Sequence, residues 1–261
     1  MAKLIQMELR RLFMSKVFYV SMAITAAVNL ALQISAPIFT RTFMPETPIQ
    51  PQRVSDFFAQ PFGFPLVIVA LIISVISFTY ADIANGYVKN IAGQIPRKSD
   101  VVIAKFVAVG VHNMVFFLVS ALTVVIGTLI PTAMGHETIE FDSGLGAGLL
   151  TFLIKWLLAM AMSAILLFLT TGVQNKTIAT VAGIFLGTGS LNLLYFGINE
   201  GVKAIFHVGK FSVNEFMPDQ LINQVNVGAN VAVIHSVAVS VVCIALFAVL
   251  TVRLFNRRDI K

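Results

Sequence analysis

Charged residues are scarce in this sequence of 261 residues. Asp, Glu, Lys and Arg together make up 11% of it, whereas a soluble globular domain has about 25%. Hydrophobic residues make up 57%, and the mean hydropathy is +0.89. A chain of this size folded in water has to cover much of its surface with polar groups, and this one has too few of them. The composition therefore excludes a water-soluble fold.

Cysteine is nearly absent as well. Cys243 is the only one, whereas a disulfide framework or a cysteine-based metal cluster needs at least two thiols close together. We therefore expect neither a disulfide nor a metal site. The formal net charge of +6 is compatible with nucleic-acid binding, but the placement of the basic residues relative to a membrane accounts for it, and we expect no nucleic-acid partner.

Six apolar stretches have the length of about 20 residues that a helix needs to cross a bilayer. They cover residues 17–36, 63–81, 101–130, 147–171, 177–198 and 230–252. None of them alternates as a strand does, and a helix satisfies its own backbone hydrogen bonds inside lipid. The sequence thus predicts an all-α polytopic membrane protein whose residues 1–261 form a single transmembrane domain with six transmembrane helices.

The basic residues indicate the orientation of these helices. One set of connecting and terminal segments, at residues 1–16, 82–105, 172–176 and 253–261, holds thirteen cations and four acids, and the opposite set holds four cations and eight acids. Short cytoplasmic loops are enriched in Lys and Arg. We therefore expect a multi-pass protein of the bacterial plasma membrane with both termini in the cytoplasm.

Two segments outside the spans are amphipathic. Residues 1–16 place Ile5, Leu9 and Leu12 on one helical face with cations on another, which predicts an interfacial helix on anionic lipid or, alternatively, a solvated basic tail. Residues 199–229 are too apolar for a free loop and too interrupted to span, so we expect an outer re-entrant or interfacial segment. Proline-rich residues 37–62 are expected to be extended or turning.

The inner loop between the second and third spans, residues 82–100, carries the most functional information. Its apolar residues recur every four positions and so share one face of a short helix: Ile83, Tyr87, Ile91 and Ile95. Pro96 ends this expected helix. A short amphipathic helix on the cytoplasmic side has the shape to fit a groove on a soluble partner.

The polar and glycine residues of this loop resemble those of the type 2 ABC-transporter permeases, especially the small six-span bacterial ones whose ATPase is a separate subunit. They are Asp82, Asn85, Gly86, Lys89, Asn90, Gly93, Arg97 and Lys105. The resemblance extends over the whole chain as architecture: an N-terminal interfacial helix, six spans and a long last outer segment. Tyr87 departs from the pattern, because many relatives have a small hydroxyl residue there.

The resemblance implies that the loop helix is a cytoplasmic coupling helix seated on an ATPase subunit. The residues implied in coupling are Asp82, Gly86, Tyr87, Lys89, Asn90, Gly93, Arg97 and Lys98. No Walker A sequence is present to cradle phosphates, so ATP and Mg would be bound by a partner ATPase dimer and no cofactor by this chain. Six spans are half of the family's usual twelve-span pathway, which implies a second copy or a related permease.

A few polar and small residues inside the spans are candidates for a transport pathway or for packing. Lys155 either snorkels outward beside the adjacent tryptophan or faces the pathway. His112 and His235 form either a proton relay or ligand site, or hydrogen bonds between helices. Gly183 and Gly187 allow close helix approach, either within one bundle or between two chains.

The expected function is that of a non-enzymatic permease subunit of an ATP-driven exporter. Apolar spans with few fixed charges suit an amphipathic or hydrophobic substrate, and analogy suggests an antimicrobial peptide or bacteriocin, in export or self-protection. One alternative is a proton-coupled secondary transporter, which usually relies on buried carboxylates. The other is an intramembrane serine hydrolase with Ser190 as nucleophile and His235 as base.

Overall fold

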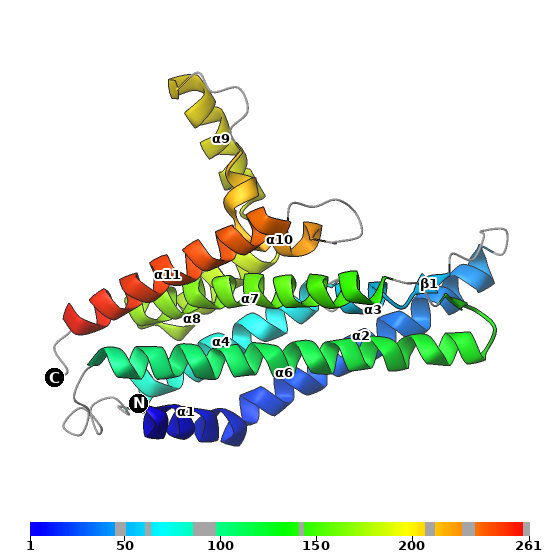
Figure 1. Ribbon diagram of the computed structural model, residues 1–261, viewed down its shortest axis with the longest axis horizontal. Helices are drawn as coiled ribbons and strands as arrows, with labels where there is room; N and C mark the ends of the chain where they lie inside the picture. Colours follow the sequence, from blue (N-terminus) through cyan, green and yellow to red (C-terminus); the bar gives the residue numbers. More distant parts are fainter. Residues whose placement is uncertain are drawn as a thin grey trace.

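The protein is a bundle of long α-helices (Figure 1). This computed structural model describes residues 1–44, 51–60, 64–85, 98–140, 144–206, 212–225 and 233–257. The helices are α1 (Ala2–Met14), α2 (Lys16–Phe43), α3 (Asp56–Ala59), α4 (Pro65–Ala84), α6 (Lys98–Ala133), α7 (Leu145–Val173), α8 (Lys176–Gly187), α9 (Asn192–Phe206), the 3-10 helix η3 (Val213–Phe216), α10 (Pro218–Gln224) and α11 (Val233–Arg257). The strands are β1 (Gln52–Arg53) and β2 (Ile139–Glu140).

Five helices of the described chain are long and apolar enough to cross a membrane, namely α2, α4, α6, α7 and α11. Their apolar side chains face lipid or one another, and each helix satisfies its own backbone groups. The all-α polytopic membrane fold predicted from the sequence is therefore confirmed. Figure 1 shows α1 and the C-terminal end of α11 at one end of the bundle and β1 at the other.

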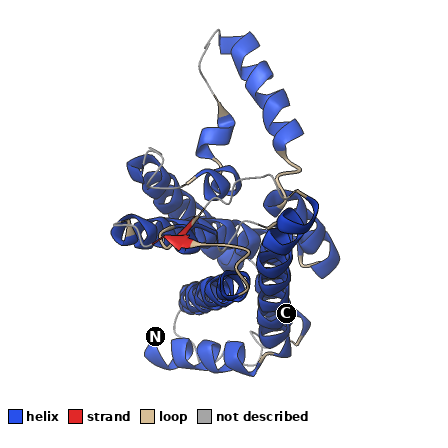
Figure 2. Ribbon diagram, turned by 90° about the vertical axis from the view of Figure 1, so that its right-hand side faces the viewer, coloured by secondary structure: helices blue, strands red, loops and turns tan. Residues whose placement is uncertain are grey.

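The predicted fifth span, residues 177–198, is not one straight helix. Helix α8 ends at Gly187, and α9 leaves it at an angle of 70°. Gly189, with φ +72°, takes a left-handed conformation that ends a helix. Helix α8 has 12 residues and is thus about 18 Å long, shorter than the hydrocarbon core of about 30 Å. A sixth span exists only if the bent pair counts as one, and α9 projects away from the bundle (Figures 1 and 2).

Gly183 and Gly187 of α8 face α4 within the same chain. A Cβ atom on Gly183 would lie 2.7 Å from Cγ2 of Ile72, and one on Gly187 would lie 2.7 Å from Cγ2 of Ile68. Both distances are shorter than real contacts allow, so only glycine lets the two helices approach this closely. The two glycines therefore pack inside one bundle.

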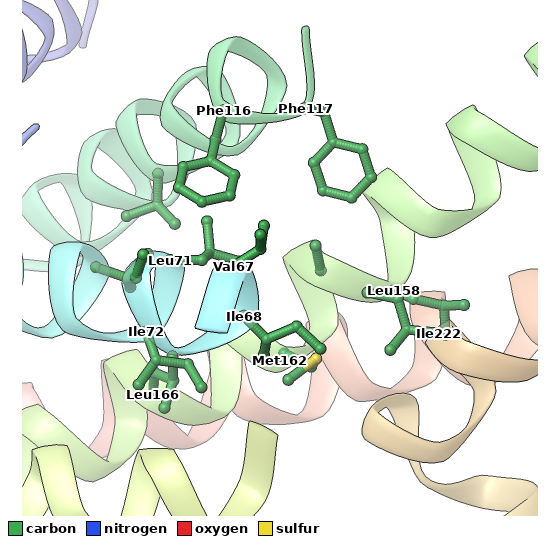
Figure 3. Packing of buried hydrophobic residues seen from close by; sticks show 14 of the residues in the cluster. Val67, Ile68, Leu71, Ile72, Phe116, Phe117, Leu158, Met162, Leu166 and Ile222 are labelled. Carbon is green, nitrogen blue, oxygen red and sulfur yellow. The ribbon is translucent and has the colours of Figure 1, made fainter. Parts of the chain in front are cut away.

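The apolar core lies where α4, α6 and α7 meet. Buried side chains of the three helices face one another in Figure 3, among them Val67, Leu71, Phe116, Phe117, Leu158 and Met162. Burial of one such side chain stabilises the fold by about 1.5–3 kcal/mol in water, but lipid is itself apolar, so close packing carries more of the stability here. The three helices consequently form the packed centre of the molecule.

The C-terminal end of the second helix differs from the prediction. Helix α2 continues through Pro37 to Phe43, whereas the sequence predicted extended or turning chain from residue 37. A proline inside a helix removes one hydrogen bond, and the hydroxyl groups of Thr40 and Thr42 donate to carbonyl oxygens one turn back, at 3.0 and 2.8 Å. A short parallel pairing of β1 with β2, which no sequence pattern indicated, follows at this end.

Candidate functional site

Four charged side chains meet at the end of the bundle that holds the N-terminus. Asp82 belongs to the last turns of α4, and Lys105 to the second turn of α6. Glu8 and Arg11 lie one turn apart on α1. These four residues, the ion cluster, therefore join three helices that are far apart in the sequence.

Each charge in the ion cluster has an opposite charge beside it. Nη1 of Arg11 donates to both carboxylate oxygens of Glu8, at 2.9 and 3.1 Å. Nη2 of Arg11 donates to Asp82, which also pairs with the ammonium group of Lys105. The Arg11 guanidinium further lies 5.7 Å from the centre of the Phe78 ring. Two acids and two bases thus form one neutral network.

The ion cluster is largely closed to solvent. The Glu8 and Asp82 side chains are 1% and 2% exposed, and that of Lys105 is 9% exposed. Removing one partner of such a buried pair costs about 3–5 kcal/mol, because a charge remains without compensation. The three helices are therefore held together at this point by paired charges.

The ion cluster lies on both sides of the expected coupling loop. Six of the eight residues implied in coupling, Gly86 to Arg97, are outside the described residues, and Lys98 is the first residue of α6. Asp82 lies inside α4 and is buried, and its carboxylate contacts Arg11 and Lys105. Glu8 and Arg11 were not identified from the sequence.

His112 connects three helices near the middle of the bundle. It is 1% exposed, and its Nε2 atom lies 2.8 Å from the hydroxyl oxygen of Ser74 on α4. Its Nδ1 atom is 3.2 Å from the side-chain oxygen of Asn113, whose amide nitrogen donates to Ser163 of α7 at 2.9 Å. This arrangement is the one expected for hydrogen bonds between helices.

Lys155 and His235 do not join His112 in a single site. Lys155 lies on α7 and is 6% exposed, so it does not snorkel to the surface of the chain. The adjacent Trp156 donates from Nε1 to the carbonyl oxygen of Gly110, 3.3 Å away inside the bundle. His235, at the start of α11, is 2.6 Å from the carbonyl oxygen of Glu215. The three candidates thus have separate surroundings.

The residues proposed for a serine hydrolase are not paired in the described structure. The hydroxyl oxygen of Ser190 is 2.8 Å from that of Thr188, and His235 contacts the Glu215 carbonyl instead. A nucleophile and its base need to be within hydrogen-bond reach of each other. In the described part of the chain, no group of three or more His, Cys, Asp or Glu side chains could hold a metal ion.

Helix α10 is connected to α9 through a buried carboxyl group. Asp219 of α10 is 1% exposed and accepts hydrogen bonds from the Tyr195 hydroxyl at 3.2 Å and the Gln220 amide at 2.8 Å. Burial raises the pKa of Asp219, and these hydrogen bonds oppose the rise. The contacts attach α10 to the base of α9.

Comparison with known protein families identifies the chain. A family model described as "ABC-2 family transporter protein" matches residues 4–196, which is most of the sequence and includes α1 to α8. A comparison with the curated proteins found no match. The family implies pairing with an ABC ATPase subunit. The chain belongs to the ABC-2 family of transporter proteins and is a transmembrane subunit of an ABC transporter.

Proposed function

We propose that this chain is the permease subunit of an ATP-driven exporter and that residues 82–100 form its coupling loop. The observation that carries the proposal is the ion cluster, which links α1 to the helices on both sides of this loop. A force applied by the ATPase to the loop would reach α4 and α6 directly and α1 through Arg11. The cluster thus supports a rigid transmission element at the ATPase side.

The surface around the ion cluster supports the same orientation. The exposed charged residues described at this end include the cations Lys3, Arg10, Lys16, Lys176, Arg253 and Arg257. The acids Glu8 and Asp82 are buried in the ion cluster, so they do not offset this charge at the surface. Cations concentrate on the cytoplasmic side of membrane proteins. We infer that both termini are cytoplasmic and that α1 lies on the inner leaflet of the bacterial plasma membrane.

The proposed polar contacts with the ATPase are Lys89, Arg97 and Lys98, with Tyr87 and Asn90 on the same loop. ATP and Mg would be bound by the ATPase dimer, and this chain would need no cofactor of its own. A complete pathway would require a second copy of the chain or a related permease. The chain itself would perform no covalent chemistry.

The proposed substrate is amphipathic or hydrophobic. The five long helices carry few charges, and the buried cations among them, Lys105 and Lys155, lie inside the bundle. Such helices offer mostly apolar contacts, which suit a lipid-like molecule, a drug or an antimicrobial peptide such as a bacteriocin. Peptide export or self-protection remains an inference by analogy with small permeases.

The test is copurification of an ATPase with the solubilised chain, followed by an ATPase assay. We expect a P-loop ATPase to copurify, and we expect its recovery to be lost when residues 86–95 are replaced by a Gly/Ser linker. Arg97→Glu should weaken binding and ATPase stimulation. The control is Arg53→Glu, which reverses an exposed charge at the opposite end. Intact binding after loop replacement would contradict the coupling assignment.

A further inference from the structure

A chain of amide side chains crosses the end of the bundle that is remote from the termini. Nε2 of Gln33 donates to the side-chain oxygen of Gln60 at 2.8 Å, and Nε2 of Gln60 donates to that of Gln52 at 3.0 Å. The Gln52 side chain in turn forms a hydrogen bond with Glu137. These four residues are called the glutamine ladder. All donors of its amide steps point toward the carboxyl group at its end.

The glutamine ladder ties together several backbone segments. Gln33 lies at a close approach of α2 to α6, since a Cβ atom on Gly127 would be 2.7 Å from the Cβ atom of Gln33. Gln60 follows α3, which is packed against α7: a Cβ on Gly148 would be 2.9 Å from the Ser55 carbonyl oxygen. Gln52 belongs to β1, whose amide donates to the Thr138 carbonyl at 2.8 Å. The ladder thus closes this end of the bundle.

Glu137 is the incompletely satisfied member of the ladder. It is 7% exposed, and its Oε2 atom is buried without a hydrogen-bond partner in the described part of the chain. The charged or titratable groups on the surrounding segments are His136, Arg53, Asp56 and Glu140. Arg53 pairs with Glu140 at 3.9 Å rather than with Glu137. Gln52 is therefore the partner that holds Glu137 in place.

We propose that Glu137 is a proton-binding site and that its protonated carboxyl group holds this end of the bundle closed through the glutamine ladder. An ionised carboxylate that is buried with one oxygen unpaired is costly, so the neutral acid is favoured in this position. Burial raises the pKa of Glu137, and the hydrogen bond from Gln52 lowers it in opposition. The site is independent of the coupling loop, and it would respond to pH on the side away from the proposed ATPase.

The consequence of losing the proton follows from the same contacts. The O–H bond of the carboxyl group breaks, and the proton passes to bulk water. The resulting carboxylate is stabilised by hydration when it moves toward solvent. In that position it no longer accepts the hydrogen bond from Gln52. The pairing of β1 with β2 loses its side-chain support, because Gln52 is a member of both the strand and the ladder. The end of the bundle would open as the pH rises.

The experiment is hydrogen–deuterium exchange on the full chain in lipid nanodiscs, from about pH 5 to about pH 9. Protection factors, corrected for the intrinsic pH dependence of exchange, are measured for peptides that cover residues 51–58 and 134–140. In the wild type we expect high protection at acidic pH. Above the pKa of the Glu137 carboxyl group, the protection factor should fall by up to about tenfold per pH unit, which is the limit for one linked proton.

Glu137→Gln keeps the shape of the neutral acid and cannot ionise, so its peptides should stay protected over the whole range. The matched control is Glu140→Gln, which removes an exposed carboxylate from strand β2, three residues further along the chain, and should keep the wild-type pH dependence. Protection in the wild type that does not change with pH would overturn the proposal, and this outcome can be measured even if the variants do not fold. A pH dependence that persists in Glu137→Gln would also overturn it. Protection restored at high pH by sodium or calcium ions would identify a metal-cation site in place of a proton site.

Discussion

The two ends of the bundle bury polar side chains in opposite ways. At the end that holds both termini, the ion cluster places two acids and two bases in mutual contact. At the other end, the glutamine ladder leads through neutral amides to Glu137, which has a buried oxygen without a partner among the described residues. At the first end every charge of the ion cluster is paired with an opposite charge. At the second end one carboxyl oxygen, Oε2 of Glu137, has no hydrogen-bond partner among the described residues.

The difference indicates which end resists separation of its helices and which responds to the loss of a proton. The acids and bases of the ion cluster are paired with one another, and separating them leaves buried charges without compensation, at a large cost. Ionisation of the half-satisfied carboxyl group of Glu137 would leave a buried charge with one unpaired oxygen, which favours movement of the carboxylate toward solvent. We therefore expect the ion cluster to transmit movement and the glutamine ladder to be the part that opens.

Asp82→Ala should have the largest effect, because it leaves Arg11 and Lys105 without their shared acid. Loss of one partner of a buried pair costs about 3–5 kcal/mol, and we expect a large drop in the thermal unfolding temperature of the purified protein. Lys203→Ala is the control, since Lys203 pairs with Glu200 at 2.8 Å on the surface. An equally small effect of both substitutions would show that the ion cluster is no stronger than a surface pair.

Gly127→Ala should have the next largest effect, because the new Cβ would lie 2.7 Å from Gln33 Cβ and 3.6 Å from the backbone of Leu30. Overpacking of this kind costs about 1–3 kcal/mol. The control on the same helix is Gly110→Ala, whose Cβ would meet the flexible end of Met160 at 3.4 Å. Replacing glycine by alanine inside a helix adds about 1 kcal/mol of helix propensity in both variants. The difference between their unfolding temperatures therefore reports the cost of the clash at Gly127. Equal stability would mean that α2 and α6 can separate at this point.

The stability of the protein should also depend on pH through Glu137. Its pKa is raised in the folded state by burial, so the folded protein binds this proton more tightly than the unfolded chain, whose Glu pKa is about 4.3. The contribution of Glu137 is thus fully present below that value and is lost as the pH rises through the raised pKa. The unfolding temperatures of the wild type and of Glu137→Gln should be similar in acid, and they should diverge as the pH rises through the raised pKa of Glu137. Parallel curves would contradict this.

The smallest effect is expected from Arg53→Gln. Arg53 and Glu140 are 63% and 55% exposed and 3.9 Å apart, and such surface pairs contribute about 0–1 kcal/mol. The unfolding temperature should therefore change little at physiological salt. A marked loss of stability would indicate that Arg53 stabilises the closed glutamine ladder, and the contrast between the two ends would then need revision.

Much of the fold could be predicted from apolar length alone, as α4, α7 and α11 show. The bend in the fifth stretch could not, because residues 177–198 are mostly apolar and the break at residues 188–191 contains the left-handed Gly189. Helix α2 likewise passes Pro37 where a helix end was expected. Local propensity is a weak guide in such places, because tertiary contacts override it.

The candidate site was predicted in part. Asp82 and Lys105 stood out from the sequence at the two sides of the loop, whereas Arg11 contacts Asp82 from 71 positions away. Glu8 carried a signal that could have been used, since it lies one turn from Leu12 on the face of α1 that packs into the bundle. An acid on such a face predicts a buried basic partner. The identity of that partner depends on which helices meet.

The sequence by itself determined that this protein is a multi-pass α-helical membrane protein, because apolar length and the scarcity of charge leave no other way to satisfy the backbone. It also contained the pattern of an ABC permease in the loop after Asp82. Only the tertiary structure decided that Glu8, Arg11, Asp82 and Lys105 form one network and that Glu137 ends a chain of amides. Contacts between residues far apart in the sequence depend on how the helices pack, and no local pattern records that packing.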